Sequence, residues 1–265
     1  MVKRRTSILA SILMAAAAIP LVAGDVTLVP VQDNTLYEVI LQAPEGEIPP
    51  SNGAGDFFFA GRTNFTGESR RGVLAFDVAN TIPPGSVVTA VTLTLEMSRT
   101  ISGPTMVELH RVTSDWGEGT SDAPGQEGVG APATPGDATW IHTFFPGSLW
   151  ATEGGDFSPT VSAAQSVGSV GPYTWGSTPE MVADVQAWLD DPATNFGWLV
   201  MGDELTAGSA KRFNTRENGS GVPQLAVTFQ APVPTAPTWA LVALALVLGA
   251  LAVWRLRRAA LETDN

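Results

Sequence analysis

Alternation of apolar and polar residues is the clearest pattern in the middle of the chain. In TAVTLTLEM, residues Val91, Leu93, Leu95 and Met97 fall on one side of an extended chain, with polar residues between them. The same period of two recurs in MVELHRV and PQLAVTF, at Val107, Leu109, Leu225, Val227 and Phe229. These segments predict β-strands that are buried on one face.

Shorter apolar runs predict further strands, at residues 26–29, 57–60, 72–77, 197–201 and 211–214. Connections such as IPPGS and SNGAGD supply the turn residues between strands. Many short strands with Gly- and Pro-rich connections predict a mainly β fold. We expect an antiparallel, jelly-roll-like β-sandwich.

One segment has the period of a helix instead. Ser177 or Thr178 can cap its first turn, Pro179 suits the first helical position, and Pro192 stops the run. Between these signals the apolar residues share one helical face: Met181, Val182, Val185, Trp188 and Leu189. This predicts one short amphipathic helix that packs across an edge or open end of the sandwich.

The N-terminal residues have the layout of a secretory signal peptide. Basic residues at 3–5 precede an apolar stretch at 8–19, and small residues follow. We expect residues 1–24 to form a signal helix that is removed by cleavage after Ala23 or Gly24. A buried N-terminal helix is the alternative.

The C-terminal residues predict a membrane anchor. Residues 239–254 carry no charge and have a tryptophan at each end, where indole rings prefer the membrane interface. The run is close to the lower limit of ~17 residues for a membrane span. The arginines of the tail 255–265 would stay in the cytoplasm, which leaves the domain at 25–230 outside.

The same end of the chain resembles a sorting signal. A VPT motif lies in the linker 231–238, and Trp, an apolar span and an arginine cluster follow; the residues are Val233, Pro234, Thr235, Trp239, Arg255, Arg257 and Arg258. This order resembles the IPTL/PEP C-terminal sorting domains of exported Gram-negative proteins. The resemblance implies an exosortase-like processing enzyme and release to the cell surface or matrix. Plain anchoring in the inner membrane is the alternative.

Charge and composition exclude several classes of protein. The net charge is −12, and eight basic residues face 24 acidic ones between the two apolar ends. This surplus repels phosphates and anionic headgroups, so we expect no nucleic-acid partner. The chain has no cysteine, which excludes disulfides, a thiol nucleophile and thiolate metal sites.

Blocks of sequence across 25–230 resemble the DNRLRE domain, which is similar to carbohydrate-binding module family 96. In order, they are DNTLYE, SNGAGDFFFAGRT, RRGVLAFDV, VELHRVTSDWGEGTSDA, MVADVQAWLDDPATNFGWLVMGD and KRFNTREN. The resemblance implies a non-catalytic β-sandwich in exported proteins, often attached to polysaccharide-active enzymes. Here no enzyme accompanies the domain, and the Gly- and Pro-rich segment 115–173 is longer than the usual family connection.

The sequence offers few groups for catalysis, so we expect no enzyme activity. Nucleophilic catalysis needs a base beside a hydroxyl, and the two histidines are His110, outward on an alternating strand, and His142, in a loop. Neither belongs to a GxSxG or HExxH motif. We expect no cofactor; the alternative is a structural calcium ion in DWGEGTSDA, because oxygen ligands in a Gly-rich loop suit Ca²⁺. Its candidate ligands are Asp115, Glu118 and Asp122.

Sugar binding would use aromatic faces beside hydrogen-bonding groups. Candidates are Trp116, Trp140, Trp150, Tyr173 and Trp175, with Arg62, Arg70, Arg212 and Arg216 as polar partners. An acidic polysaccharide would need the arginines to pair with its carboxylates. The alternatives are that Trp116 anchors a loop, that Trp188 and Trp198 pack in the core, and that Arg212 and Arg216 pair with Glu204 or Glu217.

Two functions from different classes therefore remain. The first is an exported surface module that binds polysaccharide or acts in matrix adhesion. The second is a purely structural protein of the extracellular matrix without a soluble ligand. A polysaccharide-active hydrolase is a third, weaker alternative.

Overall fold

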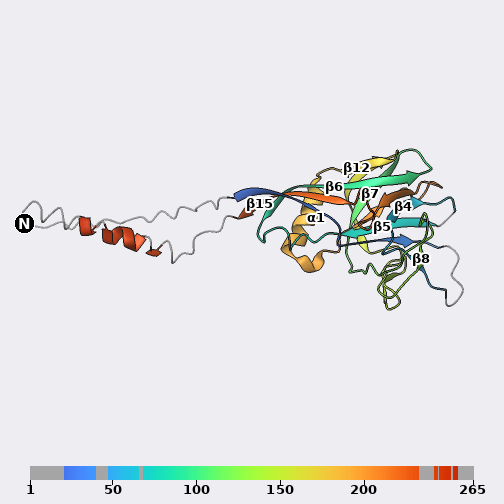
Figure 1. Ribbon diagram of the computed structural model, residues 1–265, viewed down its shortest axis with the longest axis horizontal. Coiled ribbons are helices and arrows are strands. Elements are labelled where there is room, and N and C mark those ends of the chain that lie inside the picture. The colour runs from blue at the N-terminus through green and yellow to red at the C-terminus, as the bar shows by residue number, and fades with distance from the viewer. Residues whose placement is uncertain are drawn as a thin grey trace, which may run out of the picture. The chain divides into compact units, whose positions relative to one another are not determined.

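The computed structural model describes residues 21–39, 47–65, 68–232, 242–243, 245–251 and 253–255 (Figure 1). The chain divides into two units: Ala23–Ala231 is one, and the two ends of the chain form the other. The predicted signal peptide before residue 21 lies outside the described residues. So do Val233, Pro234, Thr235, Trp239, Arg257 and Arg258.

The described strands confirm a mainly β fold with one amphipathic helix. The elements are β1 (Leu21–Leu28), β2 (Gln32–Tyr37), β3 (Pro50–Ser51), β4 (Phe57–Arg62), β5 (Ser69–Ala75), β6 (Val87–Thr100), β7 (Thr105–Val112), β8 (Ala131–Pro132), β9 (His142–Phe144), β10 (Ser148–Leu149), β11 (Phe157–Val167), β12 (Gly171–Trp175), α1 (Pro179–Asp190), the 3₁₀ turn η1 (Pro192–Thr194), β13 (Trp198–Met201), β14 (Lys211–Asn214) and β15 (Gln224–Pro232).

Eleven strands of the described chain form one large antiparallel sheet. Its spatial order is β1, β15, β6, β14, β4, β5, β13, β7 and β11, with β12 also paired to β6 and β2 to β5. The sheet curls into a half-barrel. Strand β4 joins two halves of this sheet: β1, β15, β6, β12 and β14 form one, and β5, β2, β13, β7 and β11 form the other. It pairs with β14 over residues 57–60 and with β5 through Gly61 and Arg62. Gly61 has φ +111, a conformation that other residues rarely adopt, so glycine suits the point where β4 changes partner.

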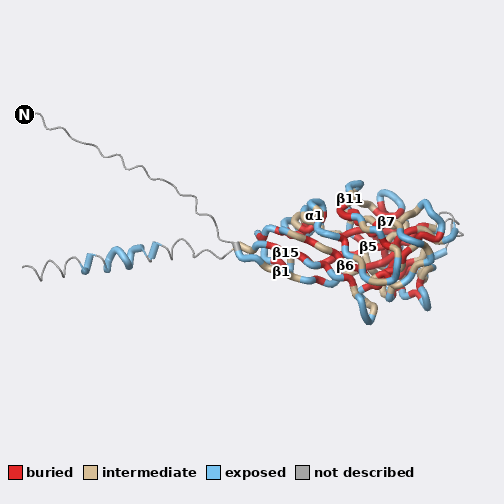
Figure 2. Tube along the Cα trace, turned by 90° about the horizontal axis from the view of Figure 1, so that it is seen from above, coloured by how far each residue is buried: buried red, intermediate tan, exposed pale blue. Residues whose placement is uncertain are grey.

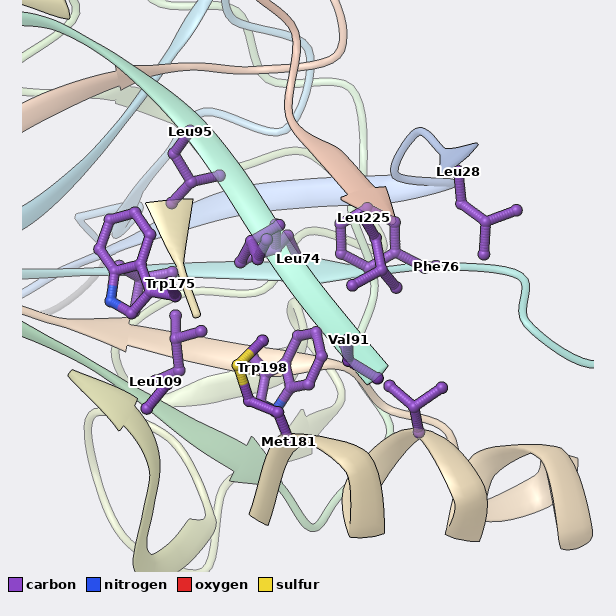
Figure 3. Close-up of a cluster of buried hydrophobic side chains, with 14 of the residues drawn as sticks. Leu28, Leu74, Phe76, Val91, Leu95, Leu109, Trp175, Met181, Trp198 and Leu225 are labelled. Atoms are coloured by element: carbon purple, nitrogen blue, oxygen red, sulfur yellow. The ribbon is translucent and has the colours of Figure 1, made fainter. Parts of the chain in front are cut away.

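The main core lies inside the curl, where apolar side chains from both halves meet (Figure 3). The predicted inward residues of β6 and β15 are all buried, which confirms the alternation. Trp198 packs against Trp188 with ring centroids 4.6 Å apart, and both are fully buried as expected. Burying such rings contributes a large share of the hydrophobic stabilisation.

Helix α1 closes one side of this core, packed against β6 and β11. Thr178 caps it by accepting a hydrogen bond from the Met181 backbone N–H at 3.1 Å, and Pro179 occupies the first turn. Its buried residues are Met181, Val185, Trp188 and Leu189, on the predicted face. In Figure 3 the Met181 side chain points from α1 toward Trp198.

A second apolar cluster covers the outer face of β5 and β13. Along these strands the residues alternate between the two clusters, so Leu74 and Trp198 face the main core while Val73 and Leu199 face outward. The long segment after β7 covers them with Trp116, Ala138 and Trp150. Strands β5 and β13 are therefore buried on both faces, and nearly all of their residues are buried. In Figure 2 the buried residues gather in the middle of this unit.

Two expectations need correction. The segment 115–173 is not a loop throughout, because β11 and β12 occupy its last third and pair with β7 and β6. His110 does not face solvent, because β11 pairs beside it and the Phe157 ring packs on its imidazole at 5.2 Å.

Residues 242–243, 245–251 and 253–255 are helical, and Arg255 belongs to this stretch. Among the helices described, none has the length and apolar character that crossing a membrane requires. The span at 239–254 stays a prediction. Strand β1 begins at Leu21, on the N-terminal side of the predicted cleavage site.

Candidate functional site

A cleft of about 340 Å³ lies over β4, β6 and β14, and three of the domain's arginines line it. We call it the arginine cleft; it is lined by Arg70, Arg99 and Arg212 with Phe59, Phe65, Ile101 and Val129. On a domain with so few basic residues, this concentration of positive charge sets the cleft apart from the rest of the surface.

The central feature of the cleft is a pair of arginines on neighbouring strands. Arg99 on β6 and Arg212 on β14 lie directly opposite each other in the sheet. Both guanidinium groups donate to the same acceptor, Gln126 Oε1, at 2.5 and 2.8 Å. Within the described part of the chain, no carboxylate forms an ion pair with either arginine.

This arrangement carries an electrostatic cost. Like charges directly opposite on adjacent strands destabilise a sheet. Burial and then the Arg99 charge lower the pKa of Arg212, and the Glu127 carboxylate offsets this only in part. An anion placed between the two guanidinium groups would relieve the repulsion.

A β-bulge brings Arg99 into the cleft. The register of β6 against β14 shifts between Arg212 and Phe213, so Ser98 is an extra residue on β6. Simple alternation after Met97 would place Arg99 on the inward face of β6, yet Arg99 is exposed. The bulge therefore turns Arg99 away from the core.

The guanidinium group of Arg212 is held in place before any ligand arrives. It stacks over the Phe57 ring, with the guanidinium carbon 3.6 Å from the ring centroid. Its Nε donates to Ser98 Oγ at 3.0 Å. These contacts leave little side-chain entropy to lose when an anion binds.

Arg70 is held even more firmly. It is almost fully buried and stacks over Tyr37 at 4.9 Å. Its guanidinium donates to the main-chain oxygens of Glu38 and Ser69, each at 2.9 Å, and Glu68 lies 3.7 Å away. Burial lowers the pKa of Arg70 without removing its charge.

Exposed apolar side chains flank the arginines. Phe65, Ile101 and Val129 expose 68%, 71% and 77% of their surfaces and line the cleft. Phe65, Glu68 and Val129 also line an adjoining hollow that contains Trp140. A ligand with both carboxylates and apolar C–H faces would match this mixture of groups.

Three predicted sugar-stacking residues are buried, which corrects the expectation for them. Trp116, Trp150 and Trp175 are 1%, 6% and 0% exposed, so their rings present no face to a ligand. Trp116 and Trp150 cover the outer face of the sheet, and Trp175 lies in the main core. Each indole N–H donates to a main-chain oxygen, of Phe196, Thr139 and Val107 respectively.

The other two predicted aromatics are half-buried. Arg71 stacks over the Trp140 ring at 4.7 Å, and Trp140 lines the hollow beside the arginine cleft. Tyr173 lies on β12, and its hydroxyl bonds the main chain of Gly168 and Ser169. Tyr173 therefore holds the turn between β11 and β12.

The four predicted arginines divide into two groups. Arg70 and Arg212 line the arginine cleft, whereas Arg62 and Arg216 do not. Arg62 donates to the main-chain oxygen of Leu205. Arg216 pairs with Glu118 and Glu217, so one alternative for it is confirmed.

The predicted calcium ligands do not come together as a set, which corrects that expectation. Asp115 accepts a hydrogen bond from the Trp116 backbone, and Asp122 is exposed. Glu118 instead lies beside Asp33 and Glu217, more than eighty residues away along the chain in each case.

Both histidines make structural contacts. His110 is bonded to the main-chain oxygen of Ser158. His142 is bonded to the Thr139 hydroxyl at 3.0 Å, but Thr139 is fully buried and its Oγ1 also accepts the backbone N–H of His142. Burial lowers the pKa of His142. This Thr–His pair stabilises a turn.

Sequence reasoning misses Arg99 and Gln126, although one signal is present. Arg99 occupies an apolar position in the alternation of β6, and a charge there marks either a strand end or a bulge. Nothing in the sequence around Gln126 indicates that it would bridge two arginines.

A comparison with protein-family models finds no matching family, and a comparison with curated proteins finds no match.

Proposed function

We propose that the unit Ala23–Ala231 is a non-catalytic module that binds acidic polysaccharide in the arginine cleft. The observation that carries the proposal is the Arg99–Arg212 pair, which shares a single neutral acceptor. A sugar carboxylate would take the place between the two guanidinium groups. The exposed side chains of Phe65, Ile101 and Val129 would contact the sugar rings.

The expected specificity follows from this charge pair. A carboxylate can accept two hydrogen bonds from one guanidinium group and also neutralises its charge, whereas a neutral sugar hydroxyl brings no charge. Two unneutralised arginines therefore favour uronate-containing polymers such as alginate over neutral glucans.

The proposal also covers the setting in which the module acts. The layout of the two chain ends supports export, membrane anchoring by residues 239–254, and processing by an exosortase-like enzyme. The resemblance to the DNRLRE domain supports the finer fold, a jelly-roll-like sandwich, and a role in surface or matrix adhesion. These statements are part of the same hypothesis.

Affinity electrophoresis tests the class of ligand. The full chain would be run in native gels that contain alginate, polygalacturonate or a neutral β-glucan. We expect retardation by the two polyuronates and little by the glucan. Arg99→Gln and Arg212→Gln should each lower the apparent affinity about tenfold, which corresponds to roughly 1.4 kcal/mol.

The matched control is Arg111→Gln. Arg111 lies on β7, pairs with Asp184 of α1 and does not line the cleft, so this change removes one charge elsewhere. It should leave the retardation unchanged. No retardation by any acidic glycan would contradict the proposal and favour a purely structural matrix protein. Release of shortened glycan would favour the hydrolase.

A further inference from the structure

Three distant segments of the chain meet at a second polar cluster outside the arginine cleft. Asp33 comes from β2, Glu118 from the segment after β7, and Arg216 and Glu217 from the turn after β14. One side-chain oxygen from each of the three acids lies within 4.8 Å of the other two. We call these four residues the carboxylate cluster.

Hydrogen bonds hold the cluster together, but they do not reach every carboxylate oxygen in it. Both oxygens of Glu118 accept from the Arg216 guanidinium, at 2.9 and 2.5 Å, and the Asp33 backbone N–H also donates to Glu118. The Arg216 backbone N–H donates to Asp33 Oδ2 at 3.0 Å. Glu217 Oε1 lies 2.9 Å from the same guanidinium.

Two carboxylate oxygens remain without a partner. Asp33 Oδ1 and Glu217 Oε2 are buried, and no donor among the described residues reaches either of them. The Asp33 side chain is fully buried. A buried carboxylate oxygen without a hydrogen bond is costly, so its retention needs an explanation.

The charge of the cluster is also unbalanced. In the deprotonated form that binds a metal, three carboxylates and one guanidinium leave two negative charges in excess. Burial, and then the neighbouring acids, raise the pKa of Asp33 well above its usual range, although the Arg216 backbone opposes this. Burial also raises the pKa of Glu217.

The geometry suits one hard divalent cation. Ca²⁺ binds carboxylate oxygens at 2.3–2.6 Å, so two of its ligands lie at most about 5 Å apart. The spacing within the cluster meets this limit. An all-oxygen set without cysteine or histidine does not favour softer metals. Ca²⁺ accepts flexible coordination by carboxylates, whereas Mg²⁺ demands near-ideal octahedral geometry and keeps several waters, so Ca²⁺ is the better match for three protein carboxylates.

We propose that Asp33, Glu118 and Glu217 bind one Ca²⁺ ion, which fastens β2 to the segments that follow β7 and β14. The unpartnered oxygens of Asp33 and Glu217 are its principal ligands, and Glu118 is the third carboxylate. The ion balances the two excess negative charges. It would act as a structural staple between segments that lie far apart in the sequence, independently of glycan binding.

Thermal unfolding and calorimetry of the full chain test this site. In Ca²⁺ the unfolding midpoint should rise with ion concentration relative to EDTA, and Mg²⁺ at the same concentration should raise it less. Titration calorimetry should show one Ca²⁺ per chain. Asp33→Asn and Glu217→Gln should each lower the Ca²⁺ affinity at least tenfold.

Asp122→Asn is the control, because Asp122 is an exposed acid near Glu118 in the sequence and lies outside the cluster. It should keep the full response to Ca²⁺. In EDTA, Asp33→Asn should be at least as stable as the wild type, because it removes an unbalanced buried charge. Equal midpoints in Ca²⁺ and EDTA with no calorimetric heat, or an unchanged response in both cluster variants, would overturn the proposal.

Discussion

At the scale of single residues, Glu127 connects the architecture to the arginine cleft. It is a non-glycine residue with φ +61, in the left-handed region. Its carboxylate accepts hydrogen bonds from the Asn52 side chain and from the backbone N–H groups of Asp56 and Phe57. These bonds offset the backbone strain and fix the position of Gln126, its neighbour in the chain.

We therefore predict that Glu127→Ala destabilises the protein by about 2–4 kcal/mol, since it leaves three donors without an acceptor. Denaturant unfolding measures this. Glu153→Ala is the control, because Glu153 is exposed, and it should change stability by less than about 0.5 kcal/mol. A Glu127→Ala protein as stable as the control would refute this role.

At the scale of elements, local signals account for most of the sheet and for the helix. The alternation in β6 and β15, the cap at Thr178 and the stop at Pro192 can all be predicted from the sequence, because each depends on neighbours along the chain. Strand β11, which the sequence does not predict, is different. Its residues alternate poorly, and its place is set by pairing with β7.

The surface that Trp116 and Trp150 cover cannot be predicted from the sequence, for a related reason. Apolar runs such as WLVM in β13 indicate a strand covered on both faces, but they do not say which segment supplies the cover. That information lies in the packing of the long segment after β7 on the sheet.

Helix α1 yields a prediction at this scale. Thr178→Ala removes both the cap on Met181 and the bond from the Thr178 hydroxyl to the main-chain oxygen of Ser162. We expect a loss of about 1–2 kcal/mol in the free energy of unfolding. Thr178→Ser keeps the hydroxyl and should recover most of it. Equal losses in both variants would show that the cap contributes nothing.

At the scale of the whole molecule, an acidic composition is combined with the arginine cleft that the described residues form. The acidic surplus is visible in the composition, and so are Arg70 and Arg212 as candidate partners of an acidic glycan. The pairing of Arg212 with Arg99 cannot be predicted from the sequence, because it depends on strand register and on a bulge. The same holds for Asp33, Glu118 and Glu217, which lie far apart in the sequence.

The acidic surplus repels a polyanion at long range, but at physiological ionic strength charges farther apart than about 8 Å are largely screened. Contacts at hydrogen-bond distance inside the cleft are screened much less. We therefore expect a local, contact-dependent interaction with acidic glycans.

Titration calorimetry with a uronate oligosaccharide is the sharpest test of the arginine cleft as a glycan site. The full-length wild type and the double variant Arg99→Gln/Arg212→Gln would be compared at physiological salt, with a neutral oligosaccharide of equal length as reference. We predict that the wild type binds the uronate and not the reference, and that the double variant binds the uronate at least about tenfold more weakly. An unchanged Kd in the double variant would contradict this role of the two arginines.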